Sequence, residues 1–372
     1  MIRVFEPYIS LKDKISVFLA LNSKNISGTS SEVLKFENKL KDYFNRKYAM
    51  TVSNGSNALD VALKLANIKE GDKVIVPSFT IISCLSAILR CGAKPVFCDV
   101  DQLSWNMTLE NVLKVYSNDV KAILMVHTYG LTAQANEIEE FCVKKNIFLI
   151  EDSAEAHGQT YMGRKCGSFG DVSTLSFYAN KHITTGEGGA VLTNFEELYL
   201  KTLKMRNLDF DNNKRFKHNN LYWNYRLGGL QAALGSSQIE KINKVITHKT
   251  KQGLIYNKLF DEYKYLVQTP LTENFGSLNH YWVYGIVLKP KKIRDKVMTT
   301  LKNNGIETRP FFWPLHLQNI NHPNYEVRHN NLETSEDIGK NGLYIPMGLH
   351  INKSKQKFIV EKVIEAIKSN LN

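Results

Sequence analysis

Residues 176–189 read SFYANKHITTGEGG, and they place Lys181 between an apolar, strand-like run and a glycine-rich turn. The turn leads into a further apolar segment, GGAVLTN (188–194), which is typical of a strand. Upstream, the run IFLIED ends at Asp152. A lysine and an aspartate thus stand at the ends of two neighbouring predicted strands.

Lysine and aspartate are the two groups that pyridoxal phosphate requires from a protein. A lysine amine bonds covalently to the carbonyl carbon of this cofactor, and a carboxylate keeps its ring nitrogen protonated. Taken singly, Asp152 also fits a strand-end residue that caps a turn, and Lys181 a surface lysine lying along apolar side chains. Their joint occurrence favours a pyridoxal phosphate enzyme with both residues in catalytic roles.

Apolar runs alternate with helical patterns between about residues 45 and 200. This alternation predicts an α/β fold in which helices cover both faces of a mostly parallel sheet. Ligands of such sheets bind beyond the carboxyl ends of the strands. The candidate groups at these ends are Gly55 with Ser56, the stretch 77–81, the stretch 127–130 and Asp152.

A phosphate site is predicted where the first core strand turns into a helix, at Gly55, Ser56 and Asn57. Backbone amides and the positive end of a helix favour an anion at such a position. The hydroxyl of Ser176 is expected to contact the same phosphate. The letters NGS also occur in plain turns, so the position after the strand carries this prediction.

Two further groups are expected around the cofactor ring. Phe79 and Ile81 follow Pro77 and offer apolar contact over the ring, although core packing explains them nearly as well. Glu155 lies one helical turn beyond Asp152. It either bonds near the phenolic oxygen of the cofactor or faces solvent.

The chain is expected to divide into a large domain over 1–244 and a small α+β domain over 245–372. A long helical pattern over 230–260 links the two. Within the small domain, HYWVYGIVLK (280–289) alternates like an exposed edge strand.

Helical spacing is clearest near the start of the chain, over residues 31–44. It predicts that Leu34, Phe36, Leu40 and Phe44 lie near one buried face of a helix.

Further phosphate contacts and substrate contacts are expected from the second half of the chain. Asn224 and Arg226 are suitable phosphate donors. The segment RPFFWPLH combines Arg309, Phe311 and His316, which suits a nucleotide diphosphate, although His316 is also read as an ordinary loop histidine.

Composition excludes several classes of protein. The chain has 372 residues, 43% of them hydrophobic, and an odd number of cysteines, five, without a CxxC pair. We expect a reduced, cytoplasmic protein without a metal site. No signal pattern and no apolar run of the ~18 residues of a membrane span are present.

The net charge of +12 reflects either a lysine-rich surface or attraction to an anionic ligand. The basic run KPKKIRDK (289–296) has no interleaved aromatic residues, so nucleic-acid binding is not expected.

Several motifs together resemble the DegT/DnrJ/EryC1/StrS family of sugar aminotransferases, from about Tyr8 to the C-terminus. The resemblance implies the aspartate aminotransferase-like fold of fold-type I pyridoxal phosphate enzymes, and a homodimer with shared active sites. The motifs are TVSNGSNAL (51–59), VIVPSFT (74–80), HTYG (127–130), IEDSAEAHG (150–158), GSFGDVSTLSFYANKHITTGEGG (167–189), NYRLGGLQAALG (224–235), HYW (280–282) and IETRPFFWPLH (306–316).

The resemblance also implies residue roles. Lys181 would bond to the cofactor, Asp152 would face its ring nitrogen, and Glu155 would lie beside the ring. Asn224 and Arg226 would reach the cofactor from the neighbouring subunit. The phosphate would be held by Gly55, Ser56, Asn57 and Ser176, and the substrate side would include Tyr178, His182, Arg309, Phe311 and His316.

The implied reaction moves an amino group from L-glutamate to C4 of a nucleotide-linked 4-keto-6-deoxyhexose. The chain is most similar to family members that act on GDP-4-keto-6-deoxymannose, which implies a place in O-antigen and lipopolysaccharide synthesis. A UDP- or dTDP-linked keto-sugar, or amination at C3, is the alternative. A non-catalytic regulator with this fold is a remote alternative, because it would be expected to lack Lys181 or Asp152.

Overall fold

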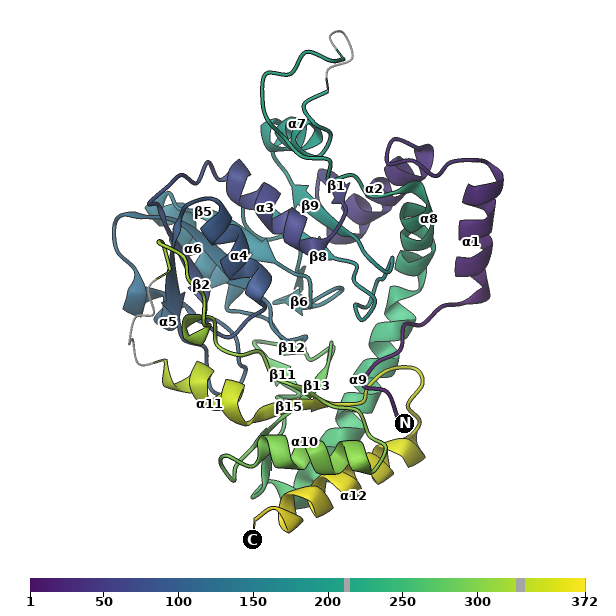
Figure 1. Ribbon diagram of the computed structural model, residues 1–372, viewed down its shortest axis with the longest axis vertical. Helices are drawn as coiled ribbons and strands as arrows, with labels where there is room; N and C mark the ends of the chain where they lie inside the picture. Colours follow the sequence, from purple (N-terminus) through teal and green to yellow (C-terminus); the bar gives the residue numbers. More distant parts are fainter. Residues whose placement is uncertain (211–214, 326–331, 372) are drawn as a thin grey trace.

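The computed structural model describes residues 1–210, 215–325 and 332–371. Its centre is a seven-stranded sheet in the order β1-β9-β8-β5-β4-β2-β3 (Figure 1). Only β9 runs antiparallel to its neighbours, so the predicted mostly parallel α/β sheet is confirmed. The strands are β1 (Tyr48–Val52), β2 (Lys73–Pro77), β3 (Lys94–Cys98), β4 (Val120–Val126), β5 (Phe148–Asp152), β8 (Val172–Ser176) and β9 (Gly189–Thr193).

Helices cover both faces of this sheet, as the alternating pattern predicts. Side chains of a strand point alternately to opposite faces. In β2, Val74 and Val76 therefore pack in the core that includes α3 (Gly55–Leu65) and α4 (Ile82–Arg90), whereas Ile75 packs in the core that includes α5 and α6. The other helices of this part are α1 (Leu11–Asn22), α2 (Ser31–Phe44), α5 (Leu109–Val115), α6 (Ala135–Lys145), α7 (Glu196–Met205) and α8 (Gly229–Gln238).

One residue expected on the buried face of α2 is exposed. Phe36, Leu40 and Phe44 are fully buried, but Leu34 is 59% exposed and Val33 takes its place in the core. A helix turns about 100° per residue, so the positions 33, 36, 40 and 44 share a face and Leu34 points away from it.

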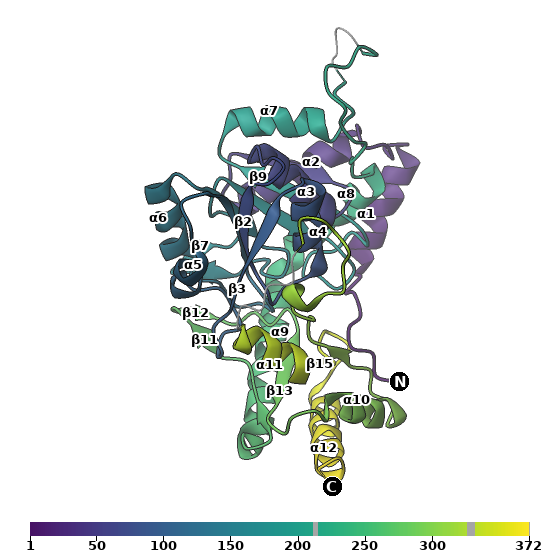
Figure 2. The same cartoon turned by 60° about the vertical axis from the view of Figure 1, so that its left-hand side comes forward.

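A second, four-stranded antiparallel sheet lies towards the C-terminus, in the order β10-β13-β15-β14 (Figure 2). It packs with helices α9, α10 and α12. These elements are α9 (Ile242–Phe260), β10 (Val267–Gln268), β13 (Tyr284–Leu288), α10 (Arg294–Asn303), β14 (Arg309–Pro310), α11 (Glu333–Asn341), β15 (Gly342–Ile345) and α12 (Lys353–Ser369).

The prediction of an exposed edge strand at 280–289 is wrong. β13 lies between β10 and β15, and all five of its residues are buried. Tyr284, Ile286 and Leu288 pack in the core of this second sheet, while Val287 packs with Trp105 and other aromatic residues. Burial on both faces, rather than exposure on one, explains the apolar character of this strand.

The first residues of the chain lie against the second sheet rather than the first. The Ile2 amide donates to the Gly305 carbonyl at 2.7 Å, and the Met347 amide donates to the Val4 carbonyl at 3.1 Å. Figure 2 shows the N-terminus beside α10.

The division of the chain into two domains at residue 244 stays a prediction. Two small hairpins are formed by β6 (Thr160–Tyr161) with β7 (Arg164–Lys165), and by β11 (Glu273–Asn274) with β12 (Ser277–Leu278).

None of the helices within the described ranges combines the length and the apolar character that a membrane crossing requires.

Candidate active site

A cavity of about 320 Å³ opens at the carboxyl ends of β1, β5 and β8. The loop after β8 brings Lys181 to it, and the last residue of β5 brings Asp152. This is the edge at which parallel α/β sheets bind ligands. The lining residues are Asn54, Gly55, Ser56, Leu59, Thr80, Ile81, Ser83, Val126, Asp152, Ala154, Glu155, Leu175, Ser176, Tyr178, Asn180, Lys181, Glu187, Trp282, Phe312 and Tyr344.

The amine of Lys181 is buried between a carboxylate and an indole. Its Nζ lies 3.5 Å from Oε1 of Glu155 and 3.7 Å from the centre of the Trp282 ring. Burial lowers the pKa of Lys181, although the negative charges of Glu155 and Asp152 act against this effect. A lowered pKa favours the neutral amine, which is the form that reacts with a carbonyl.

Asp152 is buried, and no cation from the described part of the chain contacts its carboxylate. Oδ1 accepts a hydrogen bond from the Ala154 amide at 3.0 Å, and the Cys84 thiol donates to Oδ2 at 3.6 Å. Burial raises the pKa of Asp152, while the Ala154 amide and the Lys181 charge lower it less strongly. A buried carboxyl of this kind suits a partner that brings its own positive charge, such as a protonated ring nitrogen.

Glu155 faces the cavity, and its side chain is not turned to solvent. Oε2 accepts a hydrogen bond from the Tyr129 amide at 3.1 Å, while Oε1 points towards Lys181. Burial is the main reason why the pKa of Glu155 is raised to about 7. Near neutral pH this side chain is therefore poised between its acid and its carboxylate.

The start of α3 forms the other end of the cavity. Asn54 caps this helix by accepting the Asn57 amide at 2.9 Å, and Gly55 and Ser56 follow it on the cavity wall. A Cβ at Gly55 would lie 2.8 Å from Cβ of Ser176, so only glycine permits this close approach. Amides of the first helical turn have no intrahelical partners and attract phosphate.

These groups fit pyridoxal phosphate. The cavity joins a buried lysine amine, a buried carboxyl that no described cation contacts, and a helix N-terminus for an anion. Each corresponds to one part of the cofactor: its carbonyl, its ring nitrogen and its phosphate.

Comparison with known proteins agrees with this geometry. The profile of the DegT/DnrJ/EryC1/StrS aminotransferase family matches residues 10–364. The chain belongs to this family. It is similar to a GDP-perosamine synthase of Escherichia coli O157:H7, with 36% identity over 98% of each chain. It is also similar to a GDP-perosamine synthase of Vibrio cholerae, with 37% identity over 85% of this chain and 86% of the other.

Among solved structures, an aminotransferase from Psychrobacter cryohalolentis superposes with a TM-score of 0.90 at 26% identity, over 99% of both chains. As a member of the DegT/DnrJ/EryC1/StrS family, the protein is a pyridoxal phosphate-dependent aminotransferase of nucleotide sugars. Its aspartate aminotransferase-like fold is confirmed with it.

Several residues predicted for the site are brought together in this family member. Gly55, Ser56, Ile81 and Ser176 line the cavity with Asp152, Glu155, Tyr178 and Lys181. Asn57 does not line the cavity. Its side-chain Nδ2 turns back and donates to Oγ of Ser53 at 2.7 Å.

Phe79 and Phe311 do not line the cavity. They are buried in an aromatic cluster behind it, with their ring centres 5.6 Å apart. Each ring also packs edge-on against Tyr129. Core packing, the alternative interpretation of Phe79, explains both positions.

Arg309 and His316 also lie outside the cavity. Arg309 is exposed and pairs with Glu307 at 2.8 Å. His316 is buried, with Nδ1 at 2.5 Å from Oγ of Ser78 and Nε2 at 3.4 Å from Glu336. Nδ1 therefore ties the 310–318 segment to the residue that follows β2, and Nε2 ties it to α11.

His182 points away from the cavity although it follows Lys181 directly. Its Nδ1 lies 3.3 Å from the His157 carbonyl, and burial lowers its pKa well below the usual value. Asn224 and Arg226 do not line the cavity of their own chain either, and the Arg226 guanidinium donates to the Asn207 side chain. Their contact with a neighbouring subunit stays a prediction.

Sequence reasoning missed three aromatic residues on the cavity wall: Trp282, Phe312 and Tyr344. Trp282 belongs to the HYW motif (280–282), and Phe312 follows Phe311 in the IETRPFFWPLH motif (306–316). Neither motif indicates in which direction these side chains point. Tyr344 stands in a short strand without a distinctive pattern.

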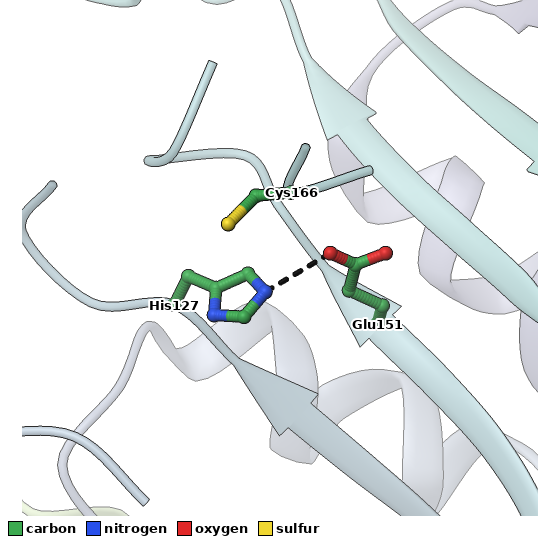
Figure 3. Close-up of side chains that lie close together, drawn as sticks. All are labelled: His127, Glu151 and Cys166. Carbon is green, nitrogen blue, oxygen red and sulfur yellow. Dashed lines mark hydrogen bonds and ion pairs between the residues drawn. The ribbon is translucent and has the colours of Figure 1, made fainter. Parts of the chain in front are cut away.

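His127, Glu151 and Cys166 meet beneath the site with metal-ligand spacing (Figure 3). The carboxylate of Glu151 is already occupied, because it accepts from His127, from the Gly167 and Phe169 amides, and from the Ser153 and Ser173 hydroxyls. Burial raises the pKa of Cys166 well above its usual value, which keeps the thiol protonated. This cluster therefore ties β4 and β5 to the 166–169 loop rather than forming a metal site.

Proposed function

We propose that the enzyme transfers the amino group of L-glutamate to C4 of GDP-4-keto-6-deoxymannose and so forms GDP-perosamine. The amine of Lys181, buried between Glu155 and Trp282 above the carboxyl of Asp152, supports the transfer. The choice of sugar is supported by the names of relatives that share 36–37% of their residues with this chain. We place the reaction in the cytoplasm, as a supply of amino sugar for an O-antigen.

The cofactor would be held by residues from three strand ends. Gly55, Ser56 and Ser176 would bind its phosphate, Asp152 would pair with its ring nitrogen, and Lys181 would bond to it covalently. When bound, pyridoxal phosphate supplies a carbonyl that takes up the amino group and a ring that delocalises the electrons of a broken Cα–H bond.

Lys181 and Glu155 would manage the protons of the reaction. The lowered pKa of Lys181 favours the neutral amine, so Nζ would take the proton from Cα of the amino acid and, in the second half of the reaction, would give a proton to C4 of the keto-sugar. Oε1 of Glu155 lies 3.5 Å from this nitrogen, and with a pKa of about 7 it is placed to share the proton. The Trp282 ring covers the amine and limits access of water.

The charge of the cavity supports a shared site in a homodimer. Lys181 is the only basic side chain among the described residues that line it, whereas Asp152, Glu155 and Glu187 are acidic. A cofactor phosphate, a nucleotide diphosphate and the carboxylates of glutamate all require cations. We propose that Asn224 and Arg226 of the neighbouring subunit supply part of this charge.

The test is a comparison of keto-sugars with purified enzyme, pyridoxal phosphate and L-glutamate. The substrates are GDP-4-keto-6-deoxymannose and the UDP- and dTDP-linked 4-keto-6-deoxyglucoses, with 2-oxoglutarate and the amino sugar measured by mass spectrometry. We expect turnover of the GDP sugar and amination at C4, assigned by NMR. Turnover of only a UDP or dTDP sugar, or an amine at C3, would reject the proposed substrate and leave the aminotransferase. Lys181→Ala is the inactive control.

A further inference from the structure

A second lysine is buried behind the active site. Lys249 lies on α9, is only 6% exposed, and donates from Nζ to the main-chain carbonyl of Trp282 at 2.6 Å. Within the described ranges no carboxylate pairs with it, and none contributes to its pKa shift. A buried ammonium without a carboxylate is costly for folding, so its presence calls for an explanation beyond packing.

Trp282 connects Lys249 to the reactive lysine. The main-chain carbonyl of Trp282 accepts the hydrogen bond from Lys249, while the indole ring of Trp282 covers Nζ of Lys181 at 3.7 Å. The indole Nε1 donates to the Asn180 carbonyl at 3.1 Å, one residue before Lys181. Lys249, the main chain of Trp282, its indole and the amine of Lys181 therefore stand in one series of contacts.

The chain around Trp282 is held in a single conformation from both sides. Tyr281 has a left-handed backbone with φ of 46°. A Cβ at Gly253 of α9 would lie 2.4 Å from the Tyr281 ring, and one at Gly130 would lie 2.6 Å from the Trp282 amide. Because α9 approaches so closely, the hydrogen bond from Lys249 fixes the carbonyl, and hence the indole, against this helix.

The surroundings of Lys249 are rich in basic groups. Burial, followed by the positive charge of Lys181, lowers the pKa of Lys249 to about 7. The charge of Lys181 thus disfavours a charge on Lys249, whereas the lowered pKa of Lys181 itself comes mainly from burial and not from Lys249. The titratable groups that face this region are Lys181 and His182 from the loop after β8, His157 after β5, His280 before β13, His248 on α9, and Glu6 and Tyr8 of the N-terminal segment.

We propose that Lys249 is a positioning residue for the reaction: its hydrogen bond to the main chain holds the Trp282 indole over the amine of Lys181 and keeps water away from that amine. The inference rests on Lys181 being the residue that bonds to the cofactor. It does not depend on which keto-sugar is the substrate.

The experiment measures the protonation of Lys181 directly. The full-length protein, freed of cofactor, is acetylated with N-hydroxysuccinimide acetate over a range of pH, and the modification of Lys181 is followed by peptide mass spectrometry. Only a neutral amine reacts, so the midpoint of the rate reports its pKa. We expect Lys249→Met to raise this midpoint by about one unit, because an indole that is no longer held lets water reach the amine and weakens the effect of burial.

Three variants separate positioning from a structural role. Lys249→Arg keeps a charge and a donor and should shift the midpoint by less than half as much. Lys251→Met removes an exposed lysine of the same helix and should leave it unchanged. Trp282→Ala exposes the amine and should raise the midpoint even if Lys249→Met does not fold.

Stability distinguishes the two roles independently. Because Lys249→Met removes a buried charge, its urea midpoint should not fall below that of the wild type. An unchanged Lys181 midpoint in Lys249→Met, or in Trp282→Ala, would overturn the proposal. So would a loss of stability in Lys249→Met without a change at Lys181, since a merely structural lysine would give that result.

Discussion

Replacing Glu155 with glutamine should make the cofactor-free protein more stable at alkaline pH. The wild-type side chain is buried beside Lys181, and its pKa is raised from 4.5 to about 7, mainly by burial. Glutamine has the same size, keeps an oxygen for the Tyr129 amide and carries no charge. The change therefore removes the cost of ionising Glu155 inside the protein and little else.

The magnitude follows from the pKa. A folded pKa above the unfolded value means that stability is fully present below pH 4.5 and is lost as pH rises through about 7. The full loss is ~3 kcal/mol, at about 1.4 kcal/mol per pKa unit. Of this, about 2 kcal/mol falls between pH 5.5 and pH 8.5. Glu155→Gln should avoid it.

The assay is urea unfolding of cofactor-free wild type and Glu155→Gln at pH 5.5 and pH 8.5. The variant should gain about 2 kcal/mol more over the wild type at the higher pH. Glu361→Gln, which changes an exposed side chain of α12, is the matched control and should show no such difference. An equal gain at both pH values, or no gain, would refute the view that Glu155 is ionised at a cost beside Lys181.

Further predictions concern the cofactor groups and the dimer. Asp152→Asn should lower the rate of amino transfer at least ~30-fold, because losing one partner of a buried charge pair costs about 2–5 kcal/mol; a variant with the wild-type rate would show that Asp152 does not face the ring nitrogen. Gly55→Ala places a Cβ 2.8 Å from that of Ser176 and should raise the Kd for pyridoxal phosphate about tenfold in a fluorescence titration, or ~1.4 kcal/mol; an unchanged Kd would place the phosphate elsewhere. Lys181→Ala and Arg226→Gln chains should each be inactive or weak alone but should regain activity when refolded together, since one site of each mixed dimer is then intact; no recovery would contradict shared sites.

The placement of Asp152 and Lys181 could be predicted from sequence because each has a local context. Asp152 ends an apolar strand, and Lys181 stands between an apolar run and a glycine-rich turn. Strand ends of a parallel sheet meet at one edge, so their proximity follows from the α/β alternation alone. The cavity that joins them with Gly55 and Ser176 bears this out.

The direction of side chains in the second half of the chain could not be predicted in the same way. Trp282 covers Lys181 from a segment a hundred residues away, because Tyr281 adopts a left-handed backbone between two close glycines. His182 adjoins Lys181 in sequence yet turns to the opposite side. No spacing rule reports such long-range contacts, and the same limit led to the wrong edge assignment for β13, whose neighbours come from distant segments.

The most direct test of the central claim is the absorption spectrum of the purified enzyme with pyridoxal phosphate, recorded before and after each substrate. If Lys181 bonds to the cofactor and the enzyme transfers amino groups, the wild type shows a visible band that Lys181→Ala lacks. The band disappears with L-glutamate and returns with GDP-4-keto-6-deoxymannose. A folded wild-type protein that shows no band with pyridoxal phosphate, or a band that L-glutamate leaves unchanged, would contradict the account.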